Sequence, residues 1–153
     1  AAPAWENTLL GRQDESQFGR PWALDLAAGG ALAAAIVKDY DVRPPQMEQP
    51  AGAFSGGNQQ KLIVGREIAK SPSLLVAANP TRGVDLGAAR LIHEKILKAK
   101  AAGAAVLLIS ADLDEVMALS DRIAVLCAGR VVGRCARAEA AIERLGLWMA
   151  GIE

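Results

Sequence analysis

The sequence predicts an α/β fold in which a helical region precedes a parallel sheet. Two observations lead to this prediction. Apolar residues recur at helical spacing up to about residue 70, whereas short continuous apolar runs of strand length follow it. These later runs alternate with helical segments across short joints, which is typical of a parallel sheet with right-handed crossovers. We therefore expect an all-helical subdomain over 1–70 and an α/β core over 71–153.

Length, composition and charge describe one globular chain of about domain size. Of its 153 residues, 52% are hydrophobic and 22% are charged. The 17 basic and 17 acidic residues cancel, which gives no electrostatic case for nucleic-acid binding. No apolar run reaches the roughly 20 residues of a membrane span. Cys127 and Cys135 lack the spacing of a zinc site, so we expect free thiols in a reducing compartment.

The helical part is expected to contain two long helices. Residues 1–22 are interrupted by proline and glycine, and we expect them to be irregular. A helix is predicted over 25–39, although two adjacent glycines weaken its middle. A loop with three prolines over 41–52 then leads to a second helix, over 58–70.

The strongest local signal is Phe-Ser-Gly-Gly-Asn-Gln-Gln-Lys at 54–61, directly before the second helix. Ser55 is a plausible N-cap, and Gly56 and Gly57 allow a ligand to approach the backbone closely. Free amide groups and the positive end of the helix dipole at such a start suit a phosphate. On these residues alone, an ordinary capped helix remains the alternative.

The second part is expected to alternate strands and helices. Two apolar runs, over 74–78 and 105–110, suit strands that are buried on both faces. A third strand is expected over 122–127 in the same parallel core, and a tight turn leads to a hairpin partner over 131–134. The expected helices cover 85–101, 112–119 and 138–149.

Five motifs in one order resemble the nucleotide-binding domain of ABC transporters. They are Ser-Gly-Gly-x-Gln at 55–59, Pro-Thr at 80–81, Gly-Val-Asp at 83–85, Ser-x-Asp-Leu-Asp-Glu at 110–115 and Asp-Arg-Ile-Ala-Val-Leu at 121–126. The match covers residues 6–133. The variants at 55–61 and 80–85 are similar to those of sugar and nucleoside importers, in which one ATPase polypeptide fuses two such domains. Residues 145–151 resemble the end of the second, C-terminal domain.

The resemblance implies a P-loop NTPase-like sheet and an ATP site shared by two domains. In that family two domains face each other head to tail, with ATP between the phosphate loop of one and the signature of the other. The implied contacts with ATP held by a partner domain come from Ser55, Gly56, Gly57, Asn58, Gln59 and Asp85. The Ser55 hydroxyl and the Gly57 amide would reach the γ-phosphate. Asp85 would lie on the loop that crosses between the domains, although a plain helix N-cap is its alternative role.

Three positions that carry the family's chemistry hold residues that cannot perform it. Metal-assisted phosphoryl transfer needs a carboxylate at the strand end to organise Mg²⁺ and another beside it to polarise water. Ala78 and Asn79 stand at those places, and Ala111 stands where a histidine contacts the γ-phosphate. We therefore expect no catalytic residue and no metal site in this chain, which alone should be inactive as an ATPase.

The phosphate loop of the family is missing from this sequence. No Gly-x-x-x-x-Gly-Lys-Ser/Thr occurs, and the family's glutamine loop is missing too. Both normally precede this region, so we expect the chain to be a piece of a longer polypeptide. Its sheet would lack the phosphate-loop strand between the strands at 106–110 and 123–126, which leaves unpaired backbone groups. We expect repacking or self-association to close that gap.

By resemblance, the chain is part of the ATP-binding subunit of an importer for nucleosides or simple sugars. Ala-Asn-Pro-Thr-Arg-Gly at 78–83 favours nucleosides. ATP and Mg²⁺ are expected in the full assembly, with neither tightly bound by this chain alone. The implied partners are an N-terminal nucleotide-binding domain, membrane-embedded permease subunits and a solute-binding protein, at the cytoplasmic face of the cell membrane.

Two other functions remain open. A non-transport ATPase of the same superfamily would carry long coiled-coil insertions, and the sequence contains none. A non-catalytic dimerisation or regulatory module is favoured by Ala78, Asn79 and Ala111, which we call the three blank positions because they lack the family's catalytic side chains. The intact signature at 55–59 instead indicates a role at a partner's site. His93 and the acidic residues at 112, 114 and 115 are interpreted as structural.

Overall fold

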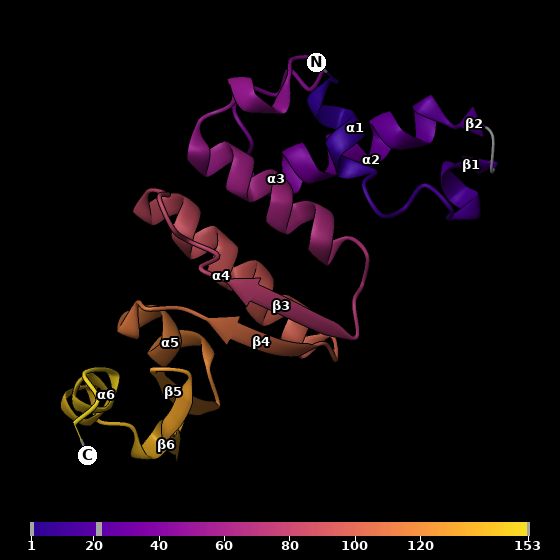
Figure 1. Ribbon diagram of the computed structural model, residues 1–153. Coiled ribbons are helices and arrows are strands. Elements are labelled where there is room, and N and C mark those ends of the chain that lie inside the picture. The colour runs from indigo at the N-terminus through magenta and orange to yellow at the C-terminus, as the bar shows by residue number, and fades with distance from the viewer. Residues whose placement is uncertain (1, 21–22, 153) are drawn as a thin grey trace. The chain divides into compact units, whose positions relative to one another are not determined.

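The computed structural model describes residues 2–20 and 23–152. Its helices are α1 Ala4–Thr8, α2 Leu26–Asp39, α3 Gly56–Ile68, α4 Leu86–Ala101, α5 Leu113–Leu119 and α6 Ile142–Met149 (Figure 1). Its strands are β1 Gly19–Arg20, β2 Ala23–Leu24, β3 Leu74–Ala78, β4 Ala105–Ile109, β5 Arg122–Cys127 and β6 Arg130–Ala136. Short 3₁₀ turns lie at Ser16–Phe18, Ala51–Ala53 and Arg137–Glu139. The predicted α/β class is confirmed.

The contacts divide the chain into two compact units. The first unit holds Ala1–Leu75 and Pro80–Leu107, and the second holds Val76–Asn79 and Leu108–Glu153. The predicted division into 1–70 and 71–153 stays a prediction. No helix within the described ranges combines the length and apolarity needed to cross a membrane.

In the first unit, α2 and α3 pack closely around an apolar core. Asp25 caps α2 by accepting a hydrogen bond from the Ala28 amide at 3.0 Å. At Gly65 of α3, a Cβ would come within 2.6 Å of Ile36 Cγ2 of α2 and within 3.2 Å of the Tyr40 ring. The close approach of the two helices therefore depends on the missing side chain at residue 65. The buried core consists of Ala4, Ala33, Ile36, Tyr40, Val42, Met47, Phe54 and Leu62.

Two details of the helical part differ from the sequence prediction. Residues 4–8 form α1 instead of irregular chain, because the Trp5 amide donates to the distant Met47 carbonyl at 3.1 Å. The first seventy residues are also not entirely helical, since β1 and β2 form a short antiparallel pair with Gly19 opposite Leu24. The last two residues of the segment predicted to be irregular, 21 and 22, lie outside the described residues.

β3 and β4 are neighbours in a two-stranded sheet. The Ala105 amide donates to the Ser73 carbonyl at 2.9 Å, and the Asn79 amide donates to the Ile109 carbonyl at 2.7 Å. The two strands therefore run in the same direction, as predicted. The prediction that they are buried on both faces is wrong, because Val76 of β3 is 54% exposed and Ile109 of β4 is 51% exposed. Strand side chains alternate between faces, and the described chain covers only one face of β3.

In the second unit, β5 and β6 form the predicted hairpin. Their register begins with Arg122 opposite Ala136, and the turn residues Ala128 and Gly129 have φ of 47° and 77°. Two positive φ angles in succession are typical of the type I′ turn that joins twisted strands. Within the described residues, β5 pairs with β6 alone, and its place in a parallel core with β3 and β4 stays a prediction. No described strand bridges β4 and β5, and a missing phosphate-loop strand stays a prediction.

Helix α6 packs on this hairpin through one large aromatic side chain. At Gly133 of β6, a Cβ would lie only 2.3 Å from the Trp148 ring, so the indole rests directly on the strand backbone. Leu145 of α6 is fully buried beside Ile123 and Val125. A small second core thus joins the last helix to the hairpin.

Candidate functional site

Ser55 begins the candidate site by capping α3. Its Oγ accepts a hydrogen bond from the Asn58 amide at 3.4 Å, and α3 starts at Gly56. The amides of Gly56 and Gly57 have no partner within the described part of the chain, as expected for a first helical turn. Ser55 and Gly56 are exposed, so these donors are accessible to an anion.

The two glycines of this turn have no packing reason within the described chain. A Cβ at Gly56 would meet only the Gly83 carbonyl oxygen, at 3.9 Å. A Cβ at Gly57 would lie 3.9 Å from Val84 and 4.0 Å from Asp85 Oδ2, which is ordinary contact. Neither glycine has the positive φ that would exclude a side chain. The neighbouring atoms therefore leave room for alanine at both positions.

Asn58 does not point freely into solvent, because its side-chain amide is fully engaged. Its Oδ1 accepts a hydrogen bond from the Arg43 amide at 3.0 Å. Its Nδ2 donates both to the Arg43 carbonyl and to Ser55 Oγ, the latter at 2.9 Å. Asn58 thus links the capping serine to the loop that follows α2.

The side chains after Asn58 attach the start of α3 to three other segments. Gln59 Nε2 donates to the Phe54 carbonyl at 2.7 Å, so this predicted ligand-binding side chain turns back on its own chain. Gln60 Nε2 donates to the Pro80 carbonyl at 2.8 Å, and Lys61 Nζ donates to the Asp41 carbonyl at 2.9 Å. No local sequence pattern predicts these roles of Gln60 and Lys61, because both contacts join residues 20 positions apart.

Asp85 lies beside the glycine turn and caps the next helix. Its carboxylate accepts a hydrogen bond from the Ala88 amide at 2.9 Å, and α4 begins at the following residue. This amide is the main reason that the pKa of Asp85 lies below its usual value, and the positive charge of Lys61 adds to the effect. The structure therefore gathers Ser55, Gly56, Gly57 and Asp85 at one place in the first unit. The capping role of Asp85 is present, and its role between domains stays a prediction.

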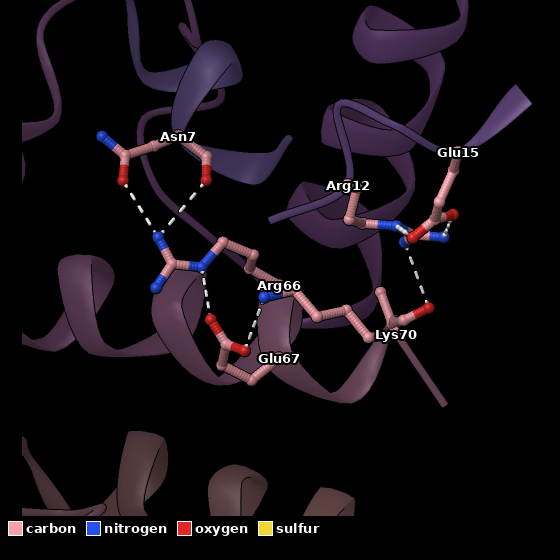
Figure 2. Close-up of polar contacts among 7 residues, drawn as sticks. Asn7, Arg12, Glu15, Arg66, Glu67 and Lys70 are labelled. Atoms are coloured by element: carbon pink, nitrogen blue, oxygen red, sulfur yellow. Dashed lines mark hydrogen bonds and ion pairs between the residues drawn. The ribbon is translucent and has the colours of Figure 1, made fainter. Parts of the chain in front are cut away.

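The far end of α3 is held by Arg12, which is only 7% exposed (Figure 2). Its Nη1 donates to the Ala69 carbonyl at the C-cap of α3, at 3.1 Å. Its Nε and Nη2 each donate to a carboxylate oxygen of Glu15 at 2.9 Å, and its guanidinium lies 4.7 Å from the centre of the Phe18 ring. The hydrogen bond from Arg12 is the main cause that lowers the pKa of Glu15.

A second cation, Arg66, ties the last turns of α3 to α1. Its Nη1 donates to Oδ1 of Asn7 at 3.2 Å and to the Asn7 carbonyl at 3.4 Å (Figure 2). Glu67 accepts from Arg66 Nε at 2.7 Å and from Lys70 Nζ at 2.8 Å. Burial raises the pKa of Glu67, but these two hydrogen bonds outweigh it and the net shift is downward. The sequence alone assigned no role to Arg66 or Glu67, and no local pattern indicates their distant partner.

The three blank positions lie in the second unit, at the carboxyl ends of β3 and β4. Ala78 is the last residue of β3, Asn79 follows it with φ of 46°, and Ala111 lies two residues after β4. All three are exposed. Asparagine tolerates this left-handed conformation better than most residues with a side chain. Among the described residues, no group of three His, Cys, Asp or Glu side chains is arranged to hold a metal ion.

Curated relatives of this chain are import ATP-binding proteins. The guanosine import ATP-binding protein NupO of Bacillus subtilis is 46% identical over 153 residues, which is 97% of this chain and 29% of that protein. The glucose import protein TsgD13 of Haloferax volcanii is 48% identical over 139 residues, or 90% of this chain and 25% of that protein. The ribose import protein RbsA 1 of Rhizobium meliloti is 35% identical over 151 residues, or 99% and 30%. The chain thus spans less than a third of these relatives. No family model matches it.

Solved structures of ABC ATPase domains share the fold. The cassette MJ0796, in a post-hydrolysis dimer with ADP and phosphate, matches with a TM-score of 0.73 and 21% identity, covering 89% of this chain and 57% of that chain. The cassette MJ1267 matches with a TM-score of 0.69 and 24% identity, covering 97% and 59%.

Proposed function

Because this chain belongs to the family of ABC import ATP-binding proteins, we propose that the start of α3 binds the γ-phosphate of an ATP molecule held by a partner nucleotide-binding domain. The Ser55 hydroxyl and the Gly57 amide are the proposed donors to the phosphate oxygens. In this proposal the chain forms part of the C-terminal domain of the importer's ATPase polypeptide. It supplies half of an ATP site in trans.

The observation that carries this proposal is the unexplained pair of glycines at 56 and 57. Glycine costs up to about 1 kcal/mol relative to alanine within a helix. No described atom lies within 3.9 Å of a Cβ placed at either residue, so packing inside the chain does not require glycine. A ligand that approaches the backbone from outside would require it. The two unpartnered amides point to an anion as that ligand.

We also propose that the chain's own half of the second ATP site is hydrolytically inactive. The alanine side chain at residue 78 has no atom that could ligate Mg²⁺, and the amide of Asn79 cannot take a proton from water. Ala111 likewise offers no donor to a phosphate. A Mg²⁺ ion bound with ATP would neutralise phosphate charge in the complete assembly, but these three residues do not fit a role in holding it.

The proposed assembly contains a second nucleotide-binding domain, permease subunits in the membrane and a solute-binding protein. We place the chain at the cytoplasmic face of that membrane. The relatives are named for the import of guanosine, glucose and ribose, which supports a nucleoside or a simple sugar as the solute. Ala-Asn-Pro-Thr-Arg-Gly at 78–83 leads us to favour a nucleoside.

The test is to replace Ser55 in the full-length polypeptide assembled with its permease. Ser55→Leu removes the proposed donor and fills the space over the glycine turn. We expect ATP hydrolysis and solute uptake to fall by about tenfold or more, in line with the loss of a donor to a transition-state oxygen. Ser73→Leu is the matched control, since Ser73 is exposed and its carbonyl, not its side chain, bonds Ala105. Unchanged rates in Ser55→Leu would favour the non-catalytic dimerisation or regulatory module.

A further inference from the structure

We propose that Asn58 is a positioning residue that sets the Ser55 hydroxyl as a hydrogen-bond donor toward the γ-phosphate. The inference rests on the proposed function of Ser55, and it assigns Asn58 a role other than direct contact with ATP. It follows from the hydrogen bonds that join Asn58 to Ser55 and to the backbone of Arg43.

The orientation of the Asn58 amide is fixed by its contacts with Arg43. A backbone N–H can only donate, so the Asn58 atom 3.0 Å from the Arg43 amide must be the oxygen, Oδ1. The other terminal atom is then the NH₂ nitrogen, which can only donate. It donates one hydrogen to the Arg43 carbonyl and the other to Ser55 Oγ at 2.9 Å. If the amide were flipped, its NH₂ group would face the Arg43 N–H, and its oxygen would face the Arg43 carbonyl, so both hydrogen bonds would be lost.

These contacts leave one direction for the hydroxyl hydrogen of Ser55. A serine hydroxyl has two lone pairs and one hydrogen. At Ser55 the lone pairs face Asn58 Nδ2 at 2.9 Å and, more weakly, the Asn58 amide at 3.4 Å. The hydrogen must therefore point away from Asn58, and Ser55 is an exposed residue. A hydroxyl that accepts hydrogen bonds is also polarised to donate more strongly.

The loop that holds Asn58 is itself fixed. Val42 is buried at 2% exposure, and the Asp41 carbonyl accepts from Lys61 Nζ of α3 at 2.9 Å. The hydrogen bonds between Asn58 and Arg43 involve the backbone of Arg43 and not its side chain, which is exposed and paired with Asp41. The loop therefore acts as a backbone support for the Asn58 rotamer. The hydroxyl direction is set before any phosphate arrives.

The test compares Asn58→Asp and Asn58→Leu in the full-length ATPase assembled with its permease, each with Ser55 intact and in the Ser55→Ala background. Aspartate has nearly the same shape but no hydrogen to donate, so it accepts the Ser55 hydrogen and turns it away from the phosphate. Leucine only releases the hydroxyl. With Ser55 intact, we expect kcat/KM for ATP to fall about tenfold or more in Asn58→Asp and by a few-fold in Asn58→Leu.

The decisive quantity is the difference between the two backgrounds, as in a double-mutant cycle. The added charge of Asn58→Asp repels phosphate in both backgrounds, whereas its effect on the hydroxyl exists only when Ser55 is present. We therefore expect the Asn58→Asp loss to be several-fold smaller in the Ser55→Ala background, and the Asn58→Leu loss to disappear. Gln59→Glu is the matched control: it adds the same charge one residue along, on a side chain that bonds the Phe54 carbonyl and not the Ser55 hydroxyl, so its loss should be equal in both backgrounds.

The possible outcomes separate this inference from the function on which it rests. If Ser55→Ala alone leaves kcat/KM unchanged, the proposed function of Ser55 fails. If Ser55→Ala lowers kcat/KM but the two Asn58 substitutions cost the same in both backgrounds, Asn58 is merely structural and the inference is overturned. The melting temperature of each variant shows whether a loss reflects unfolding.

Discussion

Single residues decide how closely the helices of the first unit pack, and Gly65 is the sharpest case. A helix with glycine in its interior is less stable than one with alanine, by about 1 kcal/mol. At Gly65 the structure explains this cost, because a Cβ would overlap Ile36 and crowd the Tyr40 ring. Gly30 of α2 carries the same cost, and no described atom lies within 4 Å of a Cβ placed there.

These two glycines make a matched pair of substitutions. We expect Gly65→Ala to destabilise the chain by about 1–3 kcal/mol, since overpacking a buried site outweighs the gain in helix propensity. Gly30→Ala should instead stabilise it by about 0.5–1 kcal/mol. Urea unfolding of the chain, followed by circular dichroism, measures both. Equal effects of the same sign would contradict the packing of α2 on α3.

At the scale of elements, side-chain hydrogen bonds hold both ends of α3. We expect substitution of a cation at its C-terminal end to cost the most stability. Arg12 is almost fully buried, and it joins the Ala69 carbonyl at the C-cap of α3 to Glu15. Arg43 also pairs with an acid, Asp41, but both side chains are exposed. Because Arg12 is buried and bonds Glu15 through two nitrogens, it should contribute to the stability of the chain. The exposed pair of Arg43 and Asp41 should contribute almost nothing.

Arg12→Met keeps the apolar stem but removes every hydrogen bond of the guanidinium. We expect the free energy of unfolding to drop by about 1.5–3 kcal/mol, the range for hydrogen bonds to charged groups. Arg12→Lys should recover little of it, because a single ammonium cannot reproduce the two-pronged contact with Glu15. Arg43→Met should change stability by less than about 0.5 kcal/mol. Thermal unfolding of the three variants tests this order, and full recovery by lysine would argue against it.

The elements with local signals were predictable from the sequence, and those held by distant contacts were not. Asp25, Ser55 and Asp85 mark the starts of α2, α3 and α4 through their caps, which the periodic apolar residues after them support. Helix α1 has five residues and depends on a loop more than 40 positions away, so its own sequence carries no sufficient signal.

The candidate site divides in the same way. Ser55, Gly56 and Gly57 follow one another and were identified as a unit, and the structure places Asp85 next to them. The contacts of Asn58 with Arg43 depend on how the intervening loop folds, which no motif specifies. The exposed faces of β3 and β4 also differ from prediction, because an apolar run predicts burial without identifying what covers it.

At the scale of the whole molecule, the chain matches only part of the length of the proteins that it resembles. It spans less than a third of its curated relatives and less than two-thirds of the solved cassettes that share its fold. Its exposed donors at the start of α3 come without a phosphate-cradling loop, since no such motif occurs in the sequence. At the three positions where the resemblance implies catalytic side chains, the sequence has Ala78, Asn79 and Ala111, and we propose that these cannot support phosphoryl transfer.

These properties predict that the isolated chain neither hydrolyses ATP nor binds it tightly. The serine and the first-turn amides of α3 provide only a few donors to one phosphate group, and most of the nucleotide would remain in water. Isothermal calorimetry of the 153-residue chain with ATP and Mg²⁺ should therefore detect no binding at micromolar concentrations. The full-length polypeptide is the positive control, because it should bind ATP under the same conditions. A micromolar dissociation constant for the isolated chain, abolished by Ser55→Leu, would place a complete nucleotide site within this chain and overturn the proposal that its ligand is held by a partner.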